Sequence, residues 1–333
     1  MLKDLPRRDN SVGGPTETSA ETKTEQEKKI AEAILSTLAF FSLYNLPLSN
    51  KRIFELLLGV KSTQTEVERM LAFLATEKII VNAGNLFALK PWDASRYHVN
   101  QLELTAKWAK VDRYFSWLSA LPFIRQVSVI NSLALGTADA DSDIDFFVVT
   151  KPGRLYFVRS VVIVLFRLLG VYKTREKIKD RFCFGFFVDA DNLKFQSLML
   201  QPQDPYFIFW LGSLRPVLGG KYYWQLVQDN QWLKQQFPNF NPMQRLASAR
   251  KPGLAFHVLK LLLEVLLWLP TLIMEPLLRR IHINHTFKLA ENNTVTSTTI
   301  ANAKMLKLHG YDVRPDVAAK FQEVLAAMPG RVN

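Results

Sequence analysis

The first apolar pattern in the chain is a helical stripe that follows a polar N-terminal segment. Residues 1–28 are rich in Thr and Glu and contain Gly-Gly-Pro, a composition typical of a disordered lead-in. From residue 30 onward, apolar positions recur at helical spacing. They are Ile30, Ile34, Leu38 and Phe41. Ser49 predicts the N-cap of a second helix. Thr63 and Glu66 predict a capping box for a third.

Two short apolar runs then predict a β-hairpin. Residues 78–81 and 86–89 flank Asn-Ala-Gly-Asn, which suits a turn with positive φ. Three helices and a hairpin over residues 29–95 resemble a winged helix, whose third helix would enter the DNA major groove. Here that helix carries more acidic than basic residues, and DNA phosphates repel such a surface. We therefore expect no tight duplex DNA binding and favour a structural or protein-contact role; a winged-helix regulator is the alternative.

Helices and strands alternate further along the chain. An amphipathic helix over residues 101–121 ends before Pro122. The predicted strands are 127–130, 145–150 and 181–188, and an apolar helix over 154–171 lies between the last two. These patterns predict an α/β (α+β) protein. Its parts are a winged-helix-like domain (29–95), a core sheet with flanking helices (101–200) and a helical C-terminal region (201–333).

The most apolar stretch of the chain is 254–278. Its longest uncharged run, 265–274, is shorter than the about 20 residues that a membrane span requires. Three charged residues and two prolines interrupt the stretch, namely Lys260, Glu264, Glu275, Pro270 and Pro276. They predict a helix pair that is packed inside the protein. The alternative is a helix pair on a membrane surface, with Arg279 and Arg280 at the headgroups.

Composition and charge narrow the possible partners. The chain has 333 residues, 48% of them hydrophobic, and a net charge of +12. Most of the basic surplus follows residue 150, which suits a compact polyanion better than a long nucleic acid. Cys183 is the single cysteine, which excludes an intramolecular disulfide framework and a zinc site built from cysteines. No secretory signal is visible, so we expect a cytoplasmic protein.

A pair of aspartates is the strongest candidate for chemistry. Asp143 and Asp145 are two residues apart, so on an extended chain their side chains face the same side. Two close carboxylates repel each other unless a cation lies between them, and hard oxygen ligands suit Mg²⁺. Upstream, Asn131, Ser132 and Gly136 lie at the end of the preceding strand, where backbone amides can bind phosphate.

Together these residues resemble the signature of the DNA polymerase β-like nucleotidyltransferase superfamily. That signature is Gly-Ser followed by Asp-x-Asp before an apolar strand, at a spacing that the ten residues between Ser132 and Asp143 match. Gly136 is in register with a second glycine of the family pattern. Asn131 stands where the family has Gly. Asn is the non-glycine residue most tolerant of left-handed backbone, so the turn can be kept.

The wider arrangement is similar to a group of uncharacterised bacterial nucleotidyltransferase-domain proteins with a winged-helix-like N-terminus. The likeness rests on Trp108, Pro122, Phe123 and the segments 191–193 and 202–206. This wider likeness implies the architecture but no substrate. The superfamily signature implies a nucleotidyltransferase core that binds Mg²⁺ through Asp143 and Asp145. It also implies transfer of a nucleoside monophosphate from an NTP, with ATP as the first expectation. The acceptor hydroxyl is left open between a small molecule, a protein and an RNA.

The resemblance also implies a third carboxylate from a later strand. Asp189, at the end of the predicted strand 181–188, is the first candidate, and Asp191 is the second. Lys151 and Arg154 follow the strand of Asp145 and are candidates for binding the triphosphate. Residues 173–181 form a basic run, either a solvated connection or a phosphate-binding lip. Without a third acid, the alternative to an enzyme is an inactive nucleotide-binding or scaffold protein.

Overall fold

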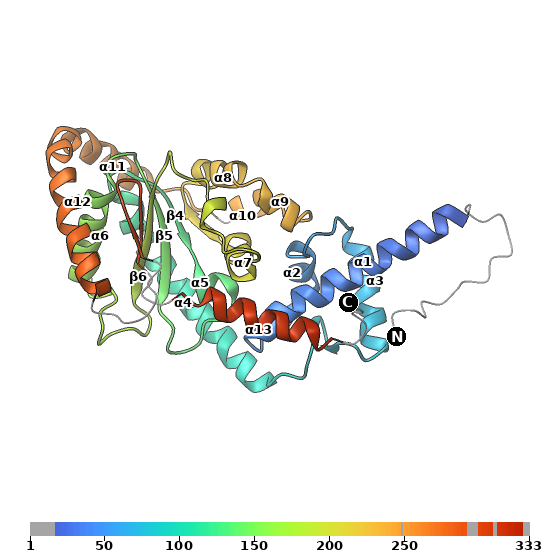
Figure 1. Cartoon of the computed structure of the whole chain (residues 1–333). Helices are drawn as coiled ribbons and strands as arrows, with labels where there is room; N and C mark the ends of the chain where they lie inside the picture. Colours follow the sequence, from blue (N-terminus) through green and yellow to red (C-terminus); the bar gives the residue numbers. More distant parts are fainter. Residues whose placement is uncertain (1–16, 248, 292–298, 309–311, 329–333) are drawn as a thin grey trace.

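The computed structural model describes residues 17–247, 249–291, 299–308 and 312–328. These residues form a mixed α/β structure. Its described residues form a three-stranded sheet and a six-stranded sheet. Figure 1 shows the N-terminal helices at one end of the molecule and α11 (Leu254–Leu266) and α12 (Trp268–Glu291) at the other. The larger sheet lies between these ends.

The N-terminal part consists of three helices and a small sheet. The helices are α1 (Glu17–Ser42), α2 (Asn50–Glu55) and α3 (Gln64–Thr76). The strands β1 (Leu48–Ser49), β2 (Val81–Ala83) and β3 (Leu86–Ala88) pair antiparallel in the order β1-β3-β2. Both predicted caps are confirmed, since Ser49 accepts a bond from the amide of Arg52 and Thr63 forms a reciprocal capping box with Glu66.

The first helix is longer than the sequence indicated. Because α1 begins at Glu17, the prediction of a disordered lead-in over residues 1–28 is wrong for residues 17–28. Polar residues such as Glu and Lys have good helix propensity, so an apolar stripe is not needed to extend a helix that is already nucleated. Residues 1–16 of that predicted segment lie outside the described residues.

The six-stranded sheet has the order β7-β4-β5-β6-β9-β8. Its strands are β4 (Ile124–Val129), β5 (Ile144–Thr150), β6 (Phe182–Asp189), β7 (Arg215–Leu218), β8 (Ile300–Ala301) and β9 (Met305–Lys307). Strand β5 runs antiparallel to β4 and parallel to β6, to which α6 (Leu155–Leu168) connects it. The core therefore does not end near residue 200, because the region 201–333, which we predicted to be helical, supplies β7, β8 and β9.

Helices cover both faces of this sheet. The remaining elements are α4 (Ala94–Ala120), α5 (Asn131–Leu135), a 3₁₀ turn (Gln196–Leu198), α7 (Pro205–Ser213), α8 (Gly220–Asp229), α9 (Trp232–Gln236), α10 (Pro242–Leu246) and α13 (Arg314–Ala326). Phe146 and Val148 of β5 belong to the apolar cluster that includes α4 and α6. Phe147 and Val149 belong to the cluster that includes α7 and the N-terminal helices. Asp145, two residues before Phe147, therefore faces the α7 side.

The helix pair α11–α12 is not packed inside the protein, so that prediction is wrong. Helix α11 has no buried residue, and most large apolar side chains of the pair are exposed. Among the described residues, no single helix is long and apolar enough to cross a membrane. The segments Leu254–Leu266 and Trp268–Lys288 meet the criteria of length and composition only together, and they are bent by 73° at their junction.

Candidate functional site

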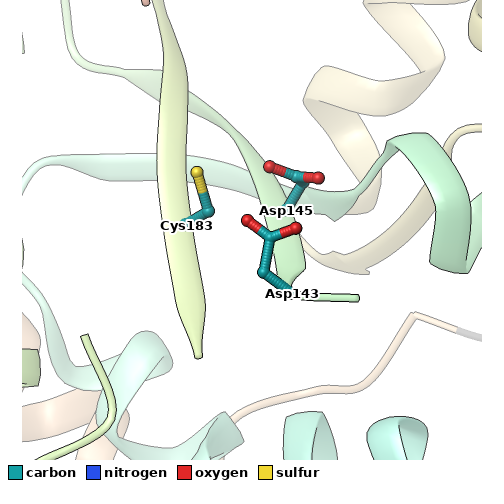
Figure 2. A group of neighbouring side chains, drawn as sticks. All are labelled: Asp143, Asp145 and Cys183. Carbon is teal, nitrogen blue, oxygen red and sulfur yellow. The ribbon is translucent and has the colours of Figure 1, made fainter. Parts of the chain in front are cut away.

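The candidate site lies at the start of β5. Asp143 immediately precedes the strand, and Asp145 is its second residue. Cys183 of β6 lies opposite Asp145 in the register of the two parallel strands. One side-chain oxygen from each aspartate and the Cys183 sulfur all lie within 4.8 Å of one another, and Figure 2 shows the three side chains clustered at this point. The sequence correctly predicted that the two aspartates lie side by side, but it assigned no role to Cys183.

Asn131 completes this cluster from the end of β4. Its backbone has φ of 55°, the left-handed conformation that we expected Asn to keep in place of Gly. Its side chain is hydrogen-bonded to Asp145, and its Oδ1 accepts a bond of 2.8 Å from Nε1 of Trp210 in α7. Trp210 thus fixes the amide of Asn131, so that it points its donor group at Asp145. No sequence pattern indicated this contact, because Trp210 reaches Asn131 from a distant segment of the chain.

Burial makes the charge of Asp145 costly. Desolvation, followed by the negative charge of Asp143, raises its pKa to about 6, although hydrogen bonds from Asn131 and Cys183 oppose the rise. Desolvation and the neighbouring Asp145 raise the pKa of the Cys183 thiol well above its ordinary value. Cys183 therefore stays protonated at neutral pH and donates to Asp145 rather than acting as a thiolate ligand.

Lys173 supplies the positive charge at this site. Its Nζ lies 2.5 Å from Oδ2 of Asp143. Burial alone would lower the pKa of Lys173, but Cys183, Asp143 and Asp145 together raise it, so the ammonium stays charged. Of the basic run 173–181, Lys173 is thus more than part of a solvated connection, because it forms an ion pair with one of the two carboxylates.

Lys107 of α4 holds the loop that carries Asp143 in place. This lysine is buried, and its Nζ donates to the carbonyl of Ser142 at 2.9 Å and to Asp180 at 2.5 Å. Within the loop, the hydroxyl of Ser142 donates to Asp139 at 2.6 Å, and this bond holds the pKa of Asp139 below its ordinary value. A signal in the sequence was available, since Lys107 interrupts the apolar stripe of the helix.

Asp189 does not join the site, so the expectation that it supplies a third carboxylate is wrong. It pairs with Thr150 at the far end of β5 and β6, six residues beyond Cys183, or about 20 Å along an extended strand. Its oxygens accept bonds from the Thr150 hydroxyl at 2.8 Å and the Gly153 amide at 3.0 Å. Asp189 therefore holds the turn that leads into α6. The second candidate, Asp191, forms an ion pair with Lys304.

Lys151 and Arg154 also lie at the far end of β5, which separates them from Asp143 and Asp145. The side chains of both stack on the ring of Phe123, and Arg154 donates to the carbonyl of Gly153. The expectation that they bind a triphosphate held at the aspartates is therefore wrong. Ser132, by contrast, adjoins Asn131 at the beginning of α5, on the side of the site.

A cavity of about 550 Å³ lies at the other end of α5. Gly136 ends that helix with φ of 76° and borders the cavity together with Arg52 and Arg215. The guanidinium of Arg52 donates to the carbonyls of Ala134 and Leu135 at 3.3 and 2.7 Å. Burial, followed by the charges of Arg215 and Arg245, lowers the pKa of Arg52 to about 9. Sequence reasoning did not find this basic cavity, because its residues come from distant segments.

Comparisons with family models, with curated proteins and with solved structures find no match to this chain.

Proposed function

We propose that this protein is a Mg²⁺-dependent nucleotidyltransferase that moves a nucleoside monophosphate from an NTP to an acceptor hydroxyl and releases pyrophosphate. The observation that carries the proposal is the pair of carboxylates on one face at the start of β5, beside Asn131 and Ser132 of the adjoining strand end. Metal-binding and phosphate-binding residues have this arrangement in the nucleotidyltransferase signature that the sequence resembles.

The donor set at the site fits a hard divalent cation. Asp143 and Asp145 offer oxygen ligands, and the raised pKa of Asp145 means that a cation beside it would relieve an unfavourable charge. Bound Mg²⁺ supplies the positive charge that phosphate oxygens require during in-line attack. Asn131 orients Asp145, while Lys173 adds a positive charge at which phosphate oxygens can bind.

The finer fold assignment belongs to the same proposal. We infer that β4, β5 and β6 with α5 and α6 form a nucleotidyltransferase-like core. We also infer that α1, α2, α3 and the β2–β3 hairpin form a winged-helix-like domain with a structural role. Helix α3 carries Glu66 and Glu68, and its Arg69 is paired with Glu27 of α1. Such a surface does not favour duplex DNA, so a winged-helix regulator is disfavoured.

The test follows the label of an NTP through the reaction. We expect the purified full chain, with Mg²⁺ and cell extract, to transfer label from the α-phosphate of one of the four NTPs to an acceptor. Label in the γ-phosphate should appear in pyrophosphate. Asp143→Asn and Asp145→Asn should each abolish transfer, whereas Asp141→Asn, an exposed residue of the same loop, serves as the matched control. Transfer of the γ-label, or transfer that survives Asp145→Asn, would contradict the proposal.

A second candidate function rests on Lys173 and Cys183. Among the described residues, the carboxylate pair is joined by Cys183 and by no third acid, and Lys173 already neutralises Asp143. This arrangement favours a catalytically inactive protein that binds nucleotide or acts as a scaffold. The two candidates differ in outcome: nucleotide-dependent thermal stabilisation without any transfer of α-label supports the inactive protein.

A further inference from the structure

The outward side of the α11–α12 pair is almost entirely apolar. Leu254 and Val265 are each 79% exposed, and Ile273 is 75% exposed. The other exposed large apolar residues from the start of α11 to Leu277 are Val258, Leu259, Leu261, Leu262, Leu266, Trp268, Leu269, Leu272, Met274 and Leu277. So many exposed large apolar side chains on one helix pair exceed the scattered ones that a soluble protein normally exposes to water.

The charged residues of the same stretch point into the protein. Nζ of Lys260 donates to the carbonyl of Ile124 at 2.6 Å. Glu264 accepts bonds from the amide of Phe123 and from the guanidinium of Arg125. Lys260 and Glu264 therefore anchor α11 to the beginning of β4.

Glu275 makes the corresponding contact for α12. It is buried, and its two oxygens accept bonds from the amides of Tyr156 and Phe157 in the first turn of α6, at 3.0 and 2.8 Å. The helix pair is therefore inverted relative to an ordinary surface helix, because its charges bind the protein body and its apolar side chains face outward. These polar contacts present the apolar side as a fixed surface.

Positive charge flanks this surface at both ends. Lys251 precedes α11, and Arg279, Arg280 and Lys288 follow the apolar half of α12; all four are exposed. Between residues 251 and 288 the only acids are Glu264 and Glu275, both of which bind the protein body. The whole chain has a net charge of +12. An apolar surface with a basic border matches the interface of a bilayer that contains anionic lipids.

We propose that the α11–α12 pair docks this protein on an anionic lipid bilayer, with the two helices lying in the plane of the interface. The apolar side chains would enter the acyl boundary, and Arg279 and Arg280 would contact headgroup phosphates. A second copy of the chain is a poorer occupant, because its own basic border would have to approach the basic border of the first. This proposal does not depend on the proposed nucleotidyltransferase activity.

The experiment measures flotation of the full chain with vesicles. We expect binding to phosphatidylcholine vesicles that contain about a third of phosphatidylglycerol, and much weaker binding to phosphatidylcholine alone. The double variant Leu266→Glu/Ile273→Glu should weaken binding by about 100-fold or more. Arg279→Gln/Arg280→Gln should weaken it by about 30-fold on the anionic vesicles only.

Two controls separate docking from general effects. Val99→Glu/Leu102→Glu changes two exposed apolar residues of α4 outside the surface and should leave binding unchanged. Brominated lipids should quench the fluorescence of Trp268, and Trp268→Phe should remove that part of the quenching. The proposal is overturned by absence of vesicle binding, or by binding that survives Leu266→Glu/Ile273→Glu. A dimer that binds no vesicles and dissociates on Leu266→Glu/Ile273→Glu would instead assign the surface to self-association.

Discussion

The carboxyl group of Asp145 binds a proton more readily in the folded chain than in the unfolded one. Its folded pKa is about 6, raised above the ordinary value of 3.8. Protonation of Asp145 therefore stabilises the folded chain. This stabilisation is complete below about pH 4 and is lost as the pH rises through about 6. We expect Asp145→Asn to remove this dependence and to stabilise the metal-free protein by about 1–3 kcal/mol at neutral pH.

The measurement is urea unfolding of the wild type and Asp145→Asn at several pH values between 4 and 8 without divalent cations. The two curves of stability against pH should converge near pH 4 and separate as the pH rises through about 6. A constant difference between the proteins across this range would show that Asp145 is not the titrating group.

Cys183 offers a way to test the proposed metal site by changing one side chain. Its sulfur already lies in the cluster with the two carboxylates, so Cys183→Asp would add a third oxygen ligand there. We expect this variant to lose stability without metal, because three carboxylates repel, and to bind Mg²⁺ about tenfold more tightly than the wild type. Thermal shift against Mg²⁺ concentration measures both effects. Cys183→Ser adds no charge and should match the wild type, and an unchanged Mg²⁺ midpoint in Cys183→Asp would count against a metal site.

At the scale of single residues, the sequence predicted the features that depend only on local backbone conformation. Asp143 and Asp145 share a side because a strand alternates, and Asn131 has the left-handed backbone that its place in the motif required. Lys107, Trp210 and Lys173 were missed as parts of the site. Each reaches it from another element, and no local pattern states which carbonyl, amide or carboxylate a long side chain will meet.

At the scale of elements, strand direction decided which predictions failed. The sequence located the bounds of β5 and β6 to within one residue. It did not state that they run parallel, and in a parallel pair the end of one strand lies far from the start of the other. Asp189 was expected beside Asp145 on the strength of its place at a strand end, but only an antiparallel partner would have brought that end to Asp143.

The sequence did not predict the orientation of α11–α12 for a related reason. A periodic pattern shows that a helix has two different sides, but it does not state which side meets the protein. Lys260, Glu264 and Glu275 were taken as signs of a buried pair, and they do contact the protein body. The apolar side chains around them face outward instead.

Helix α3 carries a prediction about nucleic acid. Its exposed side holds Glu68, which bonds Asn50, and Arg69, whose charge is paired with Glu27. We expect the full chain to bind random duplex DNA no more tightly than about 10⁻⁴ M at physiological salt, the weak end of non-specific binding. Fluorescence anisotropy with a labelled duplex measures this, and Glu66→Lys/Glu68→Lys should tighten binding. Micromolar affinity of the unmodified chain would contradict the prediction.

At the scale of the whole molecule, the N-terminal helices and the larger sheet share one apolar core. Phe40 of α1 stacks on Phe209 of α7 with ring centroids 4.0 Å apart and meets Phe321 of α13 edge-on. The same cluster continues to Phe147 in β5. The boundary that we expected near residue 95 is therefore a change of secondary structure along the chain, while the packing continues across it. Arg52 adds a polar link, since it binds the end of α5.

This continuity predicts that the molecule unfolds as one unit. Phe40 is fully buried, so Phe40→Ala should cost about 3–5 kcal/mol. It should lower a single transition that circular dichroism and tryptophan fluorescence report together. Six of the chain's seven tryptophans lie after residue 100, outside the N-terminal helices, so fluorescence follows the sheet and its covering helices. Leu102→Ala, which truncates an exposed side chain, should change stability by less than about 0.5 kcal/mol. A shared core transmits the loss of one ring to every element that packs on it. If Phe40→Ala instead lowered only a transition seen by circular dichroism and left the fluorescence transition in place, residues 29–95 would be an independent domain.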